Sequence, residues 1–276
     1  MDPKWPGGKA VAAFFSFDLD GESWLLSVDR RNADLPITMS QAAYGPKVGV
    51  YRILDVLAEL EVPSTFFVPT WVAERYPGAV EAILSGGHEL GLHGHMHERP
   101  DLLSEEEEIE VVELSIRILT EMSGRAPIGH RAPVAEISPA TNRILAERGV
   151  EYTSNYMDSV IPYFHDIDGL SLLELPMHWA ADDWGFAMVS PNAYPAPHVN
   201  PVTTNDHVVS VWSCELEGIR EVGGLFTLVN HPQVTGRPYR IDTLRRTITL
   251  AHEMDAWIAN GEEINAHWRS LPAPGQ

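Results

Sequence analysis

The sequence predicts an α/β protein whose parallel strands form a closed or nearly closed (β/α) barrel. Apolar, β-rich runs recur along the chain, and most are separated by segments with apolar residues at three- and four-residue spacing. Strands that alternate with helices imply βαβ units, and seven or eight such units favour a barrel over an open sheet. Because α/β barrels reach 276 residues as one unit, we expect a single domain over residues 1–276.

Eight apolar, β-rich segments are the predicted strands of this barrel, and the last of them is short. In chain order they are AVAAFFSF (10–17), STFFVP (64–69), HELGLH (88–93), PIGHRA (127–132), EYTSN (151–155), LLELPMH (172–178), GLFTLVN (224–230) and DAWIA (255–259).

Helical spacing is clearest in three segments, residues 48–60, 105–122 and 242–254. Ser104 stands before a run of glutamates, with Glu107 three residues further on, which is the pattern of a capping box. The acidic side chains suit the positive end of the helix dipole. We therefore expect the second of these helices to begin directly after Ser104.

Composition and charge exclude several classes of function. The formal charge is -20, from 39 acidic and 19 basic residues, and such a surface repels nucleic acid and anionic membranes. A single cysteine, Cys214, excludes an intrachain disulfide and a Cys-rich zinc site, and we expect it to be a small buried apolar residue. The N-terminal stretch MDPKWPGGKA lacks the pattern of a signal peptide, and residues 10–17 are too short to span a bilayer. We expect a cytoplasmic protein.

Polar side chains follow four of the predicted strands, where a core residue would be apolar. In parallel α/β folds active sites form at the C-terminal ends of the strands, so one shared location explains all of these side chains. They are Asp18 and Asp20 after the first strand, His93 and His97 after the third, Arg131 after the fourth and His231 after the seventh.

At the end of the first predicted strand the sequence is SFDLDGE. Asp18 and Asp20 flank Leu19, so in an extended chain both carboxylates point to one side, about 7 Å apart. Two converging carboxylates repel each other unless a cation or a proton intervenes. Gly21 follows directly, and a simple turn is an equally good interpretation.

The stretch HELGLHGHMHE holds four histidines within ten positions. His93 and His97 are four residues apart, which would place both imidazoles on one face of a helical turn, where they can bind one ion. His95 lies about 200° around such a turn, and His88 precedes a strand as a capping or loop residue. Two imidazoles and one carboxylate form a set with open positions, typical of a catalytic zinc or a related divalent ion.

His231 and Arg131 each have two interpretations. His231 directly follows a strand and precedes Pro232, so it is either structural or, beside a metal and a second carboxylate, a general acid. Arg131 is either part of a surface ion pair or a bidentate partner that orients an active-site carboxylate.

The ordered motifs SFDLD, HGHMH, RAP, ELPMHW and LVNHP resemble those of the polysaccharide deacetylase superfamily (carbohydrate esterase four, NodB homology) over residues 10–235. The resemblance implies a distorted, TIM-like (β/α) barrel of seven or eight strands with extended loops over its C-terminal face. It also implies a divalent metal, usually zinc and otherwise cobalt. The implied ligands are Asp20, His93 and His97. The implied base is Asp18, tethered by Arg131, and the implied acid for the leaving amine is His231.

One feature departs from the polysaccharide-active pattern, in which the two aspartates are adjacent. Here Leu19 separates them, as in the branch that contains peptidoglycan-deacetylase-like proteins, cyclic-imide hydrolases and metal-independent allantoinases. The presence of both histidines favours a metal-dependent member.

The expected function is therefore metal-assisted hydrolysis of a non-peptide C–N bond, with removal of an N-acetyl or other N-acyl group from an amino sugar or a small amide. Ring opening of a cyclic imide, hydantoin or allantoin is the alternative. A metal-free hydrolase and a metal- or ligand-binding barrel without turnover also stay open.

Candidate substrate contacts are Trp24, His178 and Trp184, each of which is equally compatible with packing. Asp182 and Asp183 are expected to form a solvated turn or to bind substrate amines. Residues 22–47 are long enough for a lid or a subunit contact, and a homo-oligomer is compatible with the sequence.

Overall fold

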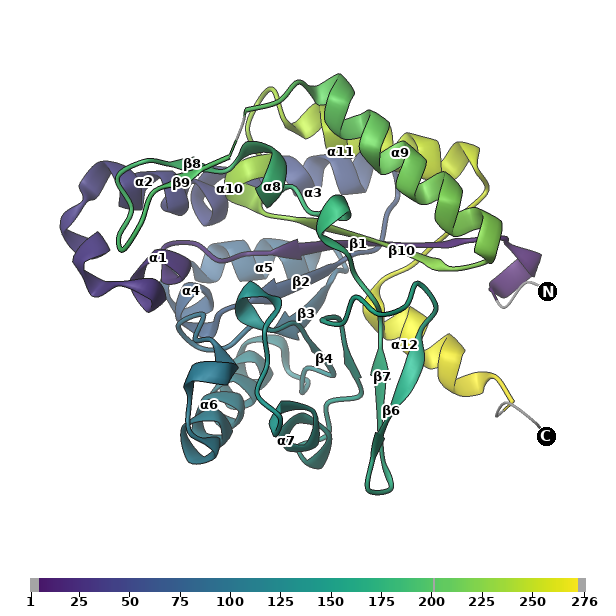
Figure 1. The fold of residues 1–276 in the computed structure, drawn as a ribbon, viewed down its shortest axis with the longest axis horizontal. Helices are drawn as coiled ribbons and strands as arrows, with labels where there is room; N and C mark the ends of the chain where they lie inside the picture. Colours follow the sequence, from purple (N-terminus) through teal and green to yellow (C-terminus); the bar gives the residue numbers. More distant parts are fainter. Residues whose placement is uncertain (1–4, 201, 273–276) are drawn as a thin grey trace.

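The computed structural model describes residues 5–200 and 202–272, and in this range the chain forms an α/β fold around one large sheet (Figure 1). The strand order is β10-β1-β2-β3-β4-β5-β7-β6, and β11 pairs with β1. All pairs are parallel except β6 with β7. The strands of the sheet are β1 (Ala12–Asp18), β2 (Thr65–Val68), β3 (Glu89–Leu92), β4 (Gly129–His130), β5 (Tyr152–Thr153), β6 (Tyr163–Ile167), β7 (Leu170–Glu174), β10 (Leu225–Asn230) and β11 (Trp257–Ile258).

The sheet is strongly curled, which confirms the expected distorted barrel. The two edges of the sheet, at β10 and at the β6–β7 hairpin, are joined by single contacts rather than by a continuous ladder of strand hydrogen bonds. The Leu225 amide donates to the Val160 carbonyl at 2.8 Å, and the Thr227 hydroxyl donates to the Pro176 carbonyl at 2.7 Å. The barrel is therefore incompletely closed beside β10.

Every predicted strand is present, each shorter than or equal to its predicted segment, but β6 was not predicted. It forms an antiparallel hairpin with β7 through a turn at Asp168 and Gly169, both of which have positive φ. Its residues are only half-buried and alternate with exposed ones, so the segment lacks the apolar run that marks the other strands. A separate two-stranded sheet pairs β8 (Val189–Ser190) with β9 (His198–Val199).

The three predicted helices are confirmed to within two residues at each end as α3 (Val50–Glu59), α6 (Glu105–Ser123) and α11 (Ile241–Glu253). Ser104 and Glu107 form the predicted capping box at the start of α6. The other helices are α1 (Ser23–Val28), α2 (Pro36–Tyr44), α4 (Thr70–Arg75), α5 (Pro77–Ser85), α7 (Thr141–Glu147), α8 (Trp184–Ala187), α9 (Asn205–Val222), α10 (Pro232–Thr235) and α12 (Gly261–Ser270). A π-helical turn, Gly45–Gly49, joins α2 to α3.

The prediction for Cys214 is wrong, because this side chain is exposed on α9. Val208, Trp212 and Leu216 form the buried face of that helix, at four-residue spacing. Cys214 follows Trp212 by two residues, about 200° around the helix, and so points to solvent.

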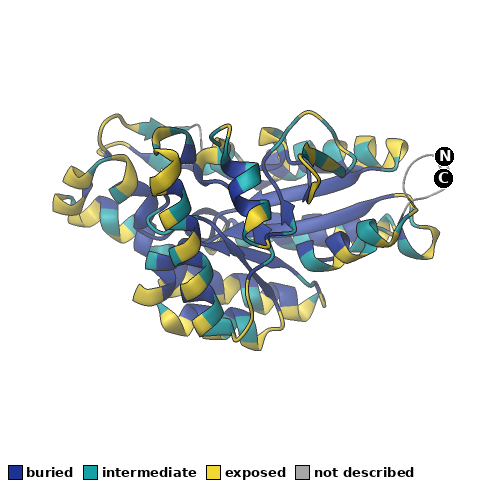
Figure 2. Ribbon diagram, turned by 90° about the horizontal axis from the view of Figure 1, so that it is seen from below, coloured by how far each residue is buried: buried dark blue, intermediate teal, exposed yellow. Residues whose placement is uncertain are grey.

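The strand β1 separates the core into two sides and carries the first polar residues of the site. Ala13, Phe15 and Phe17 pack with the helices in the largest apolar cluster, and Phe14 packs with residues of the neighbouring strands inside the curl. Because side chains alternate along a strand, Ser16 and Asp18 share the inner side with Phe14. Figure 2 shows the strands almost wholly buried and the helices exposed on one side only.

The segments α1, α2, β8 and β9 lie together beyond the C-terminal end of β1 (Figure 1). They belong to residues 22–47 and to the stretch after α8, which form the extended loops that the sequence predicts over this face. Among the described residues, no helix combines the length and the apolar character needed to cross a membrane. The first four residues of the N-terminal stretch in which no signal peptide is expected lie outside the described range.

Candidate active site and metal centre

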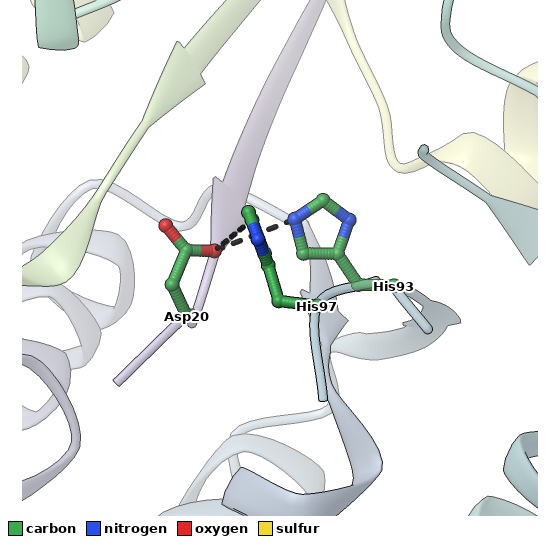
Figure 3. A group of neighbouring side chains, drawn as sticks. All are labelled: Asp20, His93 and His97. Carbon is green, nitrogen blue, oxygen red and sulfur yellow. Dashed lines mark ion pairs between the residues drawn. The ribbon is translucent and has the colours of Figure 1, made fainter. Parts of the chain in front are cut away.

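Asp20, His93 and His97 lie together at the C-terminal ends of β1 and β3 (Figure 3). The Asp20 Oδ1 atom is 3.4 Å from His93 Nε2 and 3.7 Å from His97 Nε2. All three side chains are buried. The structure therefore brings together the three residues that the sequence assigns to a metal.

The histidines do not meet on a helical turn, as the sequence analysis expects. His93 directly follows β3, and His97 lies in the loop after it with a left-handed φ of 61°. This conformation is uncommon outside glycine, and it turns the His97 ring back toward His93, with ring centroids 5.0 Å apart. His95 lies outside the pair, and its Nδ1 is 2.9 Å from the Thr70 hydroxyl.

The donor atoms of this group fit a divalent cation. His93 Nδ1 is 2.8 Å from the Arg131 carbonyl, so Nδ1 carries the proton and Nε2 has a free lone pair. Asp20 Oδ1 is buried without a hydrogen-bond partner among the described residues. Two imidazole nitrogens and one carboxylate oxygen with open positions suit a catalytic zinc ion.

The electrostatic environment keeps two of these ligands, His97 and Asp20, in the form that binds cations. Burial lowers the pKa of His97 to about 4, although the Asp20 carboxylate attracts its proton. Burial alone would raise the pKa of Asp20, but the neighbouring histidines outweigh this effect and lower the pKa of the carboxyl to about 2. At neutral pH His97 is therefore neutral and Asp20 is ionised.

Asp18 faces the same centre with one oxygen and is anchored by the other. Its Oδ1 accepts a hydrogen bond of 2.9 Å from Arg131 Nη1, and its Oδ2 is 3.9 Å from His93 Nε2. Arg131 is itself buried and donates to the Ser16 hydroxyl and to the hydroxyl and carbonyl of Ser154. The surface interpretation of Arg131 is excluded, since the guanidinium is a buried partner of the aspartate.

His231 approaches from β10 on the other side of Asp18. Its Nε2 lies 4.0 Å from Asp18 Oδ2 and 3.8 Å from Asp20 Oδ2. Its Nδ1 is 2.7 Å from Asp183 Oδ1, and its backbone amide donates to Asp183 Oδ2 at 2.9 Å. Burial opposes the charged ring, but the carboxylates of Asp182 and Asp183 raise the pKa of His231 well above its usual value. The imidazole can therefore hold a proton beside the site.

The interpretation of Asp182 and Asp183 as a solvated turn is wrong, because both side chains are buried. Asp183 also accepts a hydrogen bond of 2.6 Å from the Thr235 hydroxyl, and Asp182 accepts one of 2.7 Å from the Trp184 amide. The sequence analysis missed the role of Asp183 as the partner of His231. An acidic pair placed before Trp184 was visible, but nothing local linked it to His231, 48 residues away.

The candidate substrate contacts separate into two groups. The Trp184 ring packs edge-on against His231, with centroids 5.0 Å apart, and against Trp24 at 4.8 Å. Both tryptophans belong to a small apolar cluster formed by α1, α2, α8, the segment after α8 and α10. His178, in contrast, is exposed, and its Nδ1 accepts a hydrogen bond from the Ala180 amide. The structure therefore places Trp24 and Trp184 beside the site and His178 on the surface.

Comparisons with known proteins point to one family. The sequence pattern of the family described as polysaccharide deacetylase matches residues 43–153. The chain is 39% identical to a Mycobacterium smegmatis protein whose crystal structure is described as that of a "putative polysaccharide deacetylase". The TM-score is 0.92, and the match covers 99% of this chain and 97% of the other.

Two further relatives have more specific names. The peptidoglycan deacetylase of Helicobacter pylori is 27% identical over 291 residues, which cover 94% of this chain and 92% of that protein. The crystal structure of Puue allantoinase has a TM-score of 0.85 at 24% identity and covers 100% of this chain and 95% of its own. At this identity, the likeness to the allantoinase shows a shared fold.

Proposed function

Because the chain belongs to the polysaccharide deacetylase family, we propose that it is a metal-dependent hydrolase that removes an N-acyl group, such as acetyl, from an amino sugar or a small amide. One observation carries the proposal. A carboxylate held by an arginine and an imidazole held by an aspartate face the same point as the group Asp20, His93 and His97. Amide hydrolysis needs a base, an acid and an electrophile at one place.

The ion that we assign to Asp20, His93 and His97 is zinc, with cobalt as a functional substitute. When bound, it supplies Lewis-acid assistance to the addition of water to the amide carbonyl. Asp20, His93 and His97 would hold the ion, and a set of three protein ligands would leave coordination positions for water and substrate.

Asp18 is the proposed general base. Its Oδ2 faces the site, while Arg131 holds Oδ1 by a hydrogen bond. The carboxylate takes one proton from the water as the oxygen forms its bond to the carbonyl carbon.

His231 is the proposed general acid. The carboxylate of Asp183 orients its ring and stabilises the protonated form, so Nε2 can give a proton to the nitrogen as the C–N bond breaks. An amine leaves readily only with this proton. The products are a carboxylic acid and a free amine, and proton exchange with water restores both side chains.

The substrate can be identified with a panel of two classes, N-acetylglucosamine oligomers and the cyclic compounds succinimide, hydantoin and allantoin. The proposal predicts release of acetate from the first class. Ring opening of the second class, without acetate release, would assign the chain to the alternative reaction. Full metal occupancy with no hydrolysis in either class would favour a binding protein.

The role of Asp18 is tested by Asp18→Asn on the substrate so identified. We expect kcat to fall by a factor on the order of 10²–10⁴ with unchanged metal content, because the amide cannot accept the proton. The matched control is Asp166→Asn, which changes an exposed aspartate on β6. Full activity of Asp18→Asn would show that another group is the base.

A further inference from the structure

Gln233 is a buried side chain beside the metal group to which the reaction described above gives no role. It lies on α10, two residues after His231, and is 3% exposed. Its Nε2 donates a hydrogen bond of 3.3 Å to Asp20 Oδ2. The same short helix therefore carries a contact to the candidate ligand Asp20 and follows directly after the candidate acid.

The two oxygens of Asp20 have different surroundings. Oδ2 accepts the Gln233 hydrogen bond, whereas Oδ1 has no hydrogen-bond partner among the described residues and faces both histidines. A bond to Oδ2 restricts rotation of the carboxylate about its terminal torsion, which is otherwise broad. The Gln233 amide thereby keeps Oδ1 directed toward His93 and His97.

The chemical nature of the donor differs between the two aspartates of the site. Asp18 is bound by the cationic Arg131, and Asp20 is bound by a neutral amide. A guanidinium hydrogen-bonded to Asp20 would compete with a divalent ion for the same negative charge, whereas an amide leaves that charge available. The His231 ring, 3.8 Å from Asp20 Oδ2, lies beyond hydrogen-bond distance. This difference suits a base at Asp18 and a ligand at Asp20.

Close packing of the backbone holds Gln233 in this position. A Cβ atom on Gly45 would lie 2.9 Å from Gln233 Oε1, and one on Gly49 would lie 2.1 Å from the Pro232 carbonyl oxygen. The π-helical turn Gly45–Gly49 therefore lies directly against α10. Since α10 cannot move toward this turn, the Gln233 side chain is confined between the turn and Asp20.

We infer that Gln233 is a positioning residue for the metal site, which orients the Asp20 carboxylate so that Oδ1 completes the group with His93 and His97. The inference rests on the proposed function only in taking this group as the metal site. Partners that orient a metal ligand typically contribute 10–100-fold to metal affinity.

The test replaces the amide by an apolar side chain of similar length, Gln233→Met, and measures zinc affinity by competition with a chromophoric chelator. We expect zinc to bind about 10–100-fold more weakly, with an unchanged melting temperature of the metal-free protein. The visible absorption of the Co²⁺-loaded protein should also change, because it reports the ligand geometry. If Gln233→Met does not fold, Gln233→Leu removes the same hydrogen bond with less bulk and carries the same expectation.

The matched control is Gln41→Met. Gln41 also donates a hydrogen bond through Nε2, to the Val189 carbonyl at 2.6 Å, but it does not contact the metal group. Wild-type zinc affinity and an unchanged Co²⁺ spectrum in Gln233→Met would overturn the inference, as would an equal loss in Gln41→Met. A wild-type protein that binds neither ion would overturn it too.

Hydrolysis is not part of this measurement. A protein whose zinc affinity depends on Gln233 but which hydrolyses no amide would contradict the proposed function and support this inference.

Discussion

At the scale of single residues, Asp18 and Asp20 are separated by one leucine, yet their carboxylates have different neighbours. Arg131 binds the first, while three imidazoles and an amide surround the second. Of these two aspartates, only Asp20 has a buried oxygen without a hydrogen-bond partner among the described residues. The surroundings, rather than the residue type, distinguish the proposed base from the proposed ligand.

The two histidines His95 and His97 give a direct test of the ligand set. His97→Ala removes a proposed ligand, and we expect zinc to be lost at concentrations that saturate the wild-type protein. His95→Ala is the matched control, since its ring contacts Thr70 and lies outside the group. Metal analysis after dialysis measures both. Loss of zinc from His95→Ala with full occupancy in His97→Ala would refute the assignment.

The grouping of Asp20, His93 and His97 could be predicted from the sequence, but its geometry could not. Asp20, His93 and His97 stand at predicted strand ends, and parallel strands bring such ends together. The helical turn expected for the histidines is absent, because His97 reaches the site through a left-handed backbone conformation. Asp183 was missed because it meets His231 only through the tertiary fold.

At the scale of elements, the contact between the π-helical turn and α10 controls the position of two functional side chains. His231 precedes α10 and Gln233 lies within it, and Gly49 touches its first residue, Pro232. Glycine is required at position 49, because the backbone of the π-helical turn lies so close to α10 that any Cβ would meet the carbonyl oxygen of Pro232.

We expect Gly49→Ala to destabilise the protein by about 1–3 kcal/mol and to lower kcat, because α10 must shift away from the site. Urea unfolding and steady-state kinetics measure the two effects. Gly218→Ala is the control and should have the opposite effect on stability. Gly218 is exposed within α9 and nothing lies near its Cβ position, so alanine should stabilise the helix by about 0.5–1 kcal/mol. Equal stability of Gly49→Ala and the wild type would contradict this account of the contact.

A second element contact, between α12 and the N-terminal end of β3, is expected to depend on pH. The buried carboxylate of Glu89 accepts hydrogen bonds from the Thr65 and Tyr152 hydroxyls and from the Glu262 amide in the first turn of α12. Burial nevertheless raises the pKa of Glu89 to about 7, from 4.5. The folded state therefore favours the protonated form.

This shift has a definite sign for stability. The contribution of Glu89 is fully present below pH 4.5 and is lost as pH rises to about 7, a change on the order of 3 kcal/mol. We expect the difference in unfolding free energy between the wild type and Glu89→Gln to decrease from pH 5 to pH 7.5. A constant difference for Glu89→Gln would contradict the shift.

The elements themselves were largely predictable. Apolar, β-rich segments identify the eight parallel strands, and six of these strands are buried throughout because the sheet is covered on both faces. The strand β6 escaped prediction because it lies at the end of the sheet order and alternates between half-buried and exposed residues. Short helices such as α10 were also not predicted, since four residues are too few to show a period.

At the scale of the whole molecule, the curl of the sheet explains how residues distant in sequence form one site. The strand β1 lies between β10 and β2, and the site is built around its C-terminal end. The strands β3 and β4 bring His93 and Arg131 to the same end of the sheet. The alternation of strands and helices predicted this arrangement in outline. The place where the barrel stays open, beside β10, could not be predicted, because it depends on how β6 and β7 end the sheet.

The account as a whole depends on a metal ion acting with Asp18 and His231. The most direct measurement removes metal with a chelator, adds Zn²⁺ stepwise and follows both bound zinc and amide hydrolysis on the best substrate of the panel. We expect activity to be lost on chelation and to return in proportion to bound zinc up to one equivalent per chain. Full activity of the metal-free protein would contradict the central claim.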